Sequence, residues 1–215
     1  MSVRRLVLVR HGRTAWNHLG RAQGHADIEL DQVGHAQAAA AASYLATFDV
    51  AALWSSDLAR ALQTTAYLEK ATGLSAKHDE RLREFDVGER QGLTIPEFAE
   101  RFPQEHDAWV RGDEMLRVAG SEDTADVAAR MVPALREYVS SLDGGETGIV
   151  VTHGACLKVG LMGLLGWPAD LGTGFRGIDN CAWVTVEELA EGGRLRLASY
   201  NERASLDFAS SSPVG

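Results

Sequence analysis

Two short segments carry the residue types that transfer of a phosphoryl group requires. In the first, Arg10, His11 and Gly12 follow an apolar run; in the second, His153 and Gly154 follow another. Glycine after each histidine leaves room for backbone amides to approach an anion. Because ligands of open α/β sheets bind beyond the carboxyl ends of the strands, both histidines are predicted to lie in one site.

Arg60 and Glu84 supply the remaining roles. The reaction needs cationic groups on the phosphate oxygens, an in-line nucleophile and a proton donor for the leaving oxygen. Arg10 and Arg60 can offer planar guanidinium forks. One neutral histidine can attack phosphorus to give a phosphohistidine, and the second, protonated, can stabilise the transition state. Glu84 can donate the proton and then activate water, and Asn17 lies in the loop after His11.

This set of residues needs no metal ion and no other cofactor. No HxH, HExxH or carboxylate cluster accompanies His11 or His153, as a metal site would require. The G-x-S-x-G turn of serine hydrolases is also missing from the sequence. Taken singly, each residue of the set could be a structural histidine or a surface charge, so the prediction depends on their combination.

The elements that must position these residues alternate between strands and helices. Apolar, β-branched runs predict strands at residues 5–9, 50–54, 75–78, 148–152, 181–187 and 194–200. Helical patterns cover about 32–46, 57–71, 122–141 and 155–165. Asp31 and Asp57 are predicted to cap the first two helices, and Gly73 to end the second. This order predicts a three-layer α/β/α sandwich with a mostly parallel central sheet.

The chain is predicted to form a single domain. Its 215 residues suit one core, which we assign to residues 1–208, with 86–120 as an insertion over the site and 209–215 as a flexible tail. A formal charge of -9 argues against nucleic-acid binding. No apolar run approaches the roughly 20 residues that cross a membrane, so we expect a cytoplasmic protein without membrane contact. A homodimer is compatible with the sequence, because dimers are common.

Taken together, these motifs resemble the histidine phosphatase superfamily, also called the phosphoglycerate mutase-like family. The similar segments are residues 8–17, 21–27, 55–61, 82–94 and 151–154. The resemblance implies the phosphoglycerate mutase-like fold, His11 as the nucleophile and Glu84 as the proton donor. It implies a phosphate pocket with these members: Arg10, His11, Asn17, Gln23, Gly24, Arg60, His153 and Gly154.

Three functions are compatible with this resemblance. The first is a metal-independent phosphomonoesterase that acts through a phosphohistidine, and the second is a cofactor-dependent phosphoglycerate mutase. The third is a catalytically silent binding module, which is disfavoured because no catalytic residue is lost. Mutase-type members have a longer insertion with paired basic residues, and usually Asn after the second His-Gly, where this chain has Ala155. The sequence therefore favours the phosphomonoesterase.

The expected substrates are small phosphorylated metabolites of the sugar phosphate or phosphoglycerate type. The segment 180–183 resembles that of actinobacterial members acting on such compounds. Candidates for leaving-group contacts in the insertion are Trp109, Arg111, Met115 and Arg117. Residues 120–123 read Gly-Ser-Glu-Asp where the family often has Gly-Gly-Glu-Ser, which puts the contact made there in question.

Overall fold

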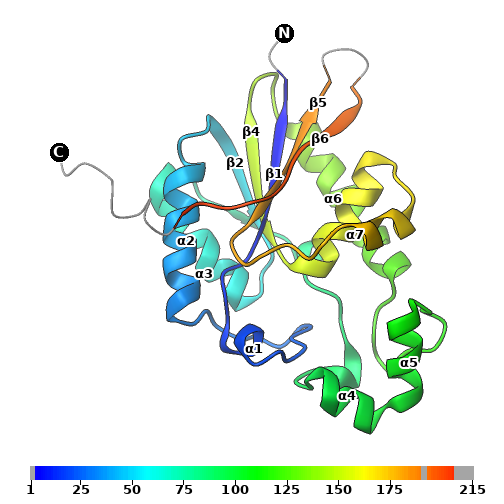
Figure 1. Ribbon diagram of the computed structural model, residues 1–215. Coiled ribbons are helices and arrows are strands. Elements are labelled where there is room, and N and C mark those ends of the chain that lie inside the picture. Colours follow the sequence, from blue (N-terminus) through cyan, green and yellow to red (C-terminus); the bar gives the residue numbers. More distant parts are fainter. Residues whose placement is uncertain (1–2, 190–192, 206–215) are drawn as a thin grey trace.

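The computed structural model describes residues 3–189 and 193–205, and within them a central six-stranded sheet carries helices on both faces (Figure 1). The strands are β1 (Arg5–Arg10), β2 (Val50–Ser55), β3 (Lys77–His78), β4 (Thr147–Thr152), β5 (Trp183–Glu188) and β6 (Leu195–Glu202). The helices are α1 (Ala15–His18), α2 (Gln32–Leu45), α3 (Ala59–Thr72), α4 (Ile95–Arg101), α5 (Pro103–Arg111), α6 (Thr124–Ser141) and α7 (Gly154–Leu165). Short 3-10 helices are η1 (Glu80–Leu82), η2 (Gly88–Arg90) and η3 (Ala169–Gly174).

The sheet order is β3-β2-β4-β1-β5-β6. The first four strands are parallel to one another, β5 runs antiparallel to β1, and β6 runs antiparallel to β5. The predicted α/β/α sandwich with a mostly parallel sheet is confirmed. The central pair, β1 and β4, runs in register with Arg10 opposite Thr152. The next residues, His11 and His153, therefore leave the sheet side by side. The amide of His11 still donates to the carbonyl of Thr152 at 2.9 Å, which fixes the start of the loop.

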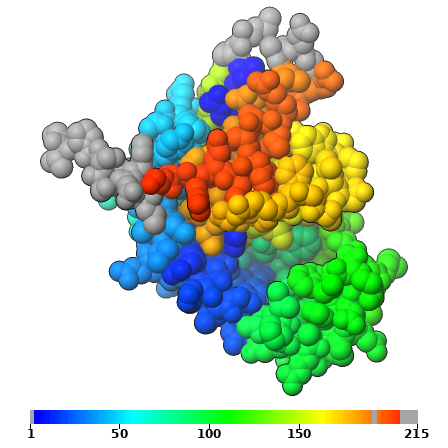
Figure 2. Space-filling view, in the orientation of Figure 1, coloured from blue at the N-terminus to red at the C-terminus, as the bar shows by residue number. Residues whose placement is uncertain are grey.

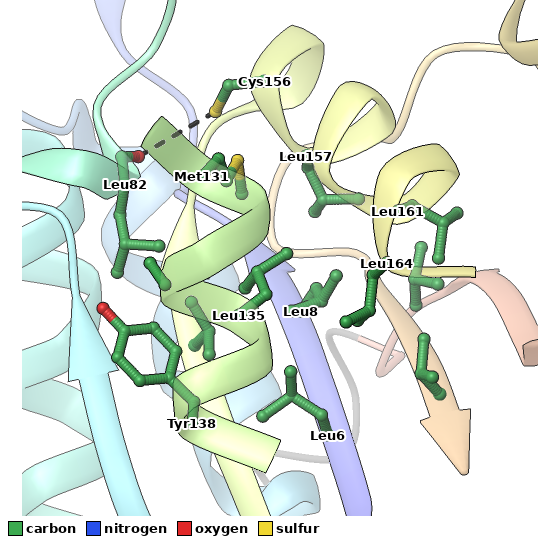
Figure 3. Packing of buried hydrophobic residues seen from close by; sticks show 14 of the residues in the cluster. Leu6, Leu8, Leu82, Met131, Leu135, Tyr138, Cys156, Leu157, Leu161 and Leu164 are labelled. Carbon is green, nitrogen blue, oxygen red and sulfur yellow. Dashed lines mark hydrogen bonds between the residues drawn. The ribbon is translucent and has the colours of Figure 1, made fainter. Parts of the chain in front are cut away.

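Two apolar cores lie on opposite faces of the sheet, and β1 contributes to both. Leu6 and Leu8 point into the core under α6 and α7, whereas Val7 and Val9 point into the core under α2 and α3. This alternation is the two-residue period of a strand with both faces covered. Figure 3 shows Leu6 and Leu8 against Leu135 of α6, within the first core. Burial on both faces holds β1, and with it His11, in a fixed position.

The start of α3 differs from the prediction. The sequence predicts Asp57 as the cap of this helix, but Leu58 occupies the cap position and the helix begins at Ala59. The carboxylate of Asp57 binds Arg83 instead. The amide of Ala59 donates to Asp27 Oδ1 at 2.6 Å, so the cap comes from the loop after β1. An ion pair with a guanidinium outcompetes a local cap, and the sequence near the helix cannot reveal the distant replacement.

Other helix boundaries follow the predicted signals. Asp31 Oδ1 accepts the amide of Gly34 at 2.8 Å at the start of α2, and Gly73 ends α3 in the left-handed region with φ 75°. Pro133 lies inside α6, which continues past it. The loop predicted after β1 contains the one-turn helix α1, which Thr14 caps.

The segment 86–120 folds into η2, α4 and α5, and extends below the sheet from the carboxyl ends of its parallel strands (Figure 1). Figure 2 shows this green segment bordering the blue loop that follows β1. The predicted tail, residues 209–215, lies outside the described residues. Among the described helices, none is long and apolar enough to span a bilayer.

Candidate active site

His11 is held as a neutral imidazole with one nitrogen free of a proton. Its Nδ1 lies 2.7 Å from the carbonyl oxygen of Gly12, which can only accept, so Nδ1 carries the proton. The side chain is 2% exposed. Burial, reinforced by Arg60 and Arg10, lowers the pKa of His11 well below its ordinary value. The lone pair on Nε2 is therefore available for attack at neutral pH.

Arg60 is the second residue of α3, and its guanidinium is fully buried. Nη1 donates to the carbonyl of Ala26 at 2.7 Å, Nη2 to that of Gly24 at 2.8 Å, and Nε to Nδ1 of His153 at 3.1 Å. These three bonds fix the group and leave two of its five N–H donors for a ligand. Burial is the main cause that lowers the pKa of Arg60 to about 10, so it is a cation at neutral pH.

Arg10, the last residue of β1, is the second cation of the site. Its Nη1 donates to the carbonyl of Ile178 at 2.5 Å, while its buried Nε has no hydrogen-bond partner in the described part of the chain. A Cβ at Gly154 would lie 3.2 Å from this Nε. Glycine at this position therefore gives the guanidinium room. Burial is the main cause that lowers the pKa of Arg10.

His153 is buried next to His11, with 5.1 Å between the ring centroids. Because Arg60 Nε donates to its Nδ1, the proton of His153 is on Nε2, which lies 2.8 Å from Ser56 Oγ. Burial, Arg60 and His11 lower the pKa of His153 well below its ordinary value. In this resting site the second histidine is therefore neutral, because Arg60 already donates to its Nδ1; the protonated form was predicted for the transition state. Neutral His153 donates its one ring proton, on Nε2, to Ser56 Oγ.

Glu84 is held by the first amides of α7. Its Oε1 accepts from the amide of Cys156 at 2.9 Å and from that of Phe85 at 3.0 Å, and its Oε2 from that of Ala155 at 3.1 Å. Carboxylates are favourable partners for helix N-termini. The carboxyl group is thus fixed at the carboxyl edge of the sheet beside Arg10.

The glycines of the two His-Gly pairs act differently from the prediction. The amide of Gly12 donates to Thr64 Oγ1 at 3.0 Å, so it does not face an anion. A Cβ on Gly12 would lie 2.6 Å from the carbonyl oxygen of Gly34, so glycine is needed for close packing against α2. The amides after Gly154 bind Glu84. The anion would therefore meet side chains at these positions, rather than the backbone.

The predicted helper residues lie on the loop after β1. Asn17 Oδ1 accepts from Thr14 N at 3.1 Å and from Asn180 Nδ2 at 3.2 Å. Gln23 Oε1 accepts from Thr14 Oγ1 at 3.0 Å. Both side chains, together with Gly24, line the same pocket as His11.

One pocket, with a volume of about 530 Å³, brings most of the predicted site together. Its lining includes Arg10, His11, Asn17, Gln23, Gly24, Arg60 and Glu84. His153 and Gly154 do not line it but contact Arg60 and Arg10, which do. Among the described residues, no cluster of three or more His, Cys, Asp or Glu side chains could hold a metal ion.

Comparison with known proteins assigns the family. The family model "Histidine phosphatase superfamily (branch 1)" matches residues 6–202. This chain belongs to the histidine phosphatase superfamily. The match covers every residue of the candidate site and all of the sheet except Arg5, the first residue of β1.

The relatives include phosphatases and mutases. The chain is 38% identical over 192 residues to the glucosyl-3-phosphoglycerate phosphatase of Mycolicibacterium vanbaalenii, covering 86% of this chain and 85% of the relative. It is 33% identical over 182 residues to the probable phosphoglycerate mutase GpmB of Yersinia pestis, covering 85% and 84%. A mycobacterial glucosyl-3-phosphoglycerate phosphatase solved in complex with VO3 superposes with a TM-score of 0.84 at 36% identity, covering 94% of this chain and all of that one.

The structure adds residues to the site of this histidine phosphatase that its sequence did not reveal. His153 is held by Ser56, and Asn17 is held by Asn180. The main chain of Glu84 is held by Arg130. The partners in these pairs are 46 to 163 residues apart in sequence, so no local pattern could have found them.

The four leaving-group candidates are divided by the structure. Trp109 and Arg117 line the pocket, whereas Arg111 and Met115 do not, and Met115 is 94% exposed. Within residues 120–123, Glu122 accepts the amide of Asp86 at 2.9 Å and pairs with Arg130.

Proposed function

We propose that this protein is a metal-independent phosphomonoesterase that hydrolyses small phosphorylated metabolites through a phosphohistidine on His11. The observation that carries the proposal is the proton-free Nε2 of His11 in one pocket with two buried guanidinium groups, those of Arg10 and Arg60. The substrate class is the sugar phosphate or phosphoglycerate type, in keeping with relatives named glucosyl-3-phosphoglycerate phosphatase.

In the first step, Nε2 of His11 attacks phosphorus and the ester P–O bond breaks. Arg10 and Arg60 stabilise the negative charge on the equatorial oxygens with their remaining N–H donors. His153 acts behind them, because its Nδ1 accepts from Arg60 Nε and so holds that guanidinium in place. Glu84, as the carboxylic acid, gives its proton to the leaving alkoxide, which departs as an alcohol.

In the second step, the Glu84 carboxylate accepts a proton from water as the water oxygen attacks phosphorus. The P–N bond to His11 breaks, inorganic phosphate leaves, and both residues return to their starting forms. Because Nδ1 of His11 keeps its proton on the Gly12 carbonyl throughout, the ring carries the positive charge of the intermediate without losing its orientation.

The competing function is a cofactor-dependent phosphoglycerate mutase, which the relative from Yersinia pestis represents. A mutase must protect its phosphohistidine from water and return the phosphate to an intermediate. The phosphatase relatives have the higher identity, and Ala155 follows the second His-Gly where mutase-type members usually have Asn. These two observations favour hydrolysis.

The test is release of phosphate from p-nitrophenyl phosphate and from a panel of phosphorylated metabolites, with interconversion of 3- and 2-phosphoglycerate measured alongside. His11→Ala should abolish release, whereas the exposed His78→Ala control should retain it. When substrate labelled on its phosphate is used and the reaction is quenched rapidly without acid, the wild type should carry the label and His11→Ala should not. Activity retained in His11→Ala would refute the nucleophile, and interconversion faster than release would favour the mutase. A cytoplasmic location and a homodimer stay predictions.

A further inference from the structure

Another arginine of the pocket, Arg90, lies on the wall contributed by the segment 86–120. Its guanidinium carbon is 4.7 Å from the ring centroid of Phe98 in α4 and 4.4 Å from that of Trp109 in α5. Both rings line the same pocket as Arg90. Aromatic faces on a guanidinium restrict its orientation and leave its N–H edge as the place where a ligand can bind.

Arg90 differs from two other arginines that line the pocket, because it has no anionic partner. Arg21 pairs with Glu97, and Arg117 pairs with Asp123. The side chain of Arg90 makes no ion pair and no hydrogen bond with any other described residue, and its Nε is buried. This is so although Glu105, Asp113 and Glu114 line the same pocket. Burial lowers the pKa of Arg90, as expected for a cation without a partner.

We propose that Arg90 binds a carboxylate on the leaving group of the substrate, at a subsite separate from the phosphate subsite formed by Arg10 and Arg60. This inference rests on the proposed function, since it concerns the part of the substrate that the reaction releases. Glycerate-type leaving groups carry such a carboxylate, and simple polyol leaving groups do not.

A carboxylate fits this position better than a second phosphate. A planar guanidinium edge accommodates two carboxylate oxygens side by side. Among the described residues of the segment 86–120 that line the pocket, Arg90 is the unpaired arginine, and the same pocket is also lined by the acidic side chains of Glu105 and Asp113. One cation in such surroundings can neutralise a monoanion but leaves a dianion with uncompensated repulsion.

The alternative is that Arg90 only joins α4 to α5 by stacking between their rings. Binding separates the two roles without depending on turnover. D-3-Phosphoglycerate and D-glycerol 3-phosphate differ only at the carboxylate, which is a hydroxymethyl group in the second compound. Their dissociation constants would be measured by calorimetry on His11→Ala protein, in which catalysis is blocked, and again after adding Arg90→Met or Arg90→Lys.

We expect the His11→Ala protein to prefer D-3-phosphoglycerate, and Arg90→Met to reduce that preference by about 10- to 100-fold, the range for loss of a charged hydrogen bond. Arg90→Lys, which keeps the charge, should retain part of it. The control Arg101→Met removes an arginine that stacks on Phe102, outside the pocket lining, and should leave the preference as it was. An unchanged preference in Arg90→Met, or none in the parent protein, would overturn the inference. Failure of the wild type to release phosphate would instead refute the proposed function, since the binding comparison stands without it.

Discussion

Replacing Arg130 with methionine should weaken both the fold and the proton transfer assigned to Glu84. Arg130, on α6, uses every nitrogen of its guanidinium. Nε and Nη2 bind the carboxylate of Glu122, both at 2.8 Å, and Nη1 binds the carbonyls of Arg81 and Arg83 at 2.9 and 2.7 Å. Nη2 also binds the carbonyl of Glu84 at 2.9 Å. The group therefore holds the main chain that carries the carboxyl group of Glu84.

The size of both effects follows from these contacts. The side chains of Arg130 and Glu122 are 19% and 22% exposed, so the pair is mostly buried. Removing one partner of a buried pair costs about 3–5 kcal/mol, and partial exposure places this case near 3 kcal/mol of unfolding free energy. Displacement of a catalytic group by about 1 Å can cost 10²-fold in rate. That loss should appear with poor leaving groups, which need the proton most.

The assay combines urea unfolding with kcat/KM for a series of phosphate monoesters of increasing leaving-group pKa. Arg130→Met should lower the unfolding free energy and make the rate depend more steeply on leaving-group pKa. Arg81→Met removes a neighbouring arginine that pairs with Asp79 and Glu137, so it serves as the control with an unchanged slope. A loss of stability without any change in that slope would show that Arg130 does not position Glu84.

Three further outcomes are expected. Gly12→Ala would place a Cβ 2.6 Å from the backbone carbonyl of Gly34, so urea unfolding should show a loss of about 1–3 kcal/mol; an unchanged midpoint would contradict the packing argument. The fold lowers the pKa values of His11 and His153, so below about pH 6.5 the unfolded chain binds more protons than the folded one. The unfolding free energy should therefore decrease as the pH falls below about 6.5, by up to about 1.4 kcal/mol per pH unit for each histidine. His153→Gln, compared with wild type by thermal melting from pH 7 to 5, should show the smaller slope, and equal slopes would refute the assignment. Chelators should leave phosphate release unchanged, because guanidinium groups neutralise the phosphate; loss restored by a divalent ion would reverse this expectation.

Much of this protein could be predicted from patterns confined to single elements. The buried runs ending at Arg10 and Thr152 identified the two central strands, and strand geometry then required His11 and His153 to be neighbours. Asp31 and Gly73 marked helix ends through chemistry within a few residues.

The features that the sequence could not reveal concern groups with partners far away in the chain. Asp57 looks like a cap until Arg83 is placed beside it. The protonation of His153 depends on Arg60, and the environment of Arg90 depends on two rings from different helices. A sequence displays each of these residues without its partner, so neither charge state nor pairing could be deduced.

The central position of β1 also determines when this site can form as the chain folds. β1 pairs with β4 and β5, which follow it by more than a hundred residues, and the carbonyl of His11 accepts from Asn180 Nδ2 at 3.1 Å. During synthesis the first strand must therefore wait, with both edges unpaired, for almost the last elements of the fold. Such distant pairings slow folding and expose intermediates to aggregation. Phosphate, which should bind only the completed site, would then pull the folding equilibrium toward the finished chain, and refolding yield should rise with its concentration.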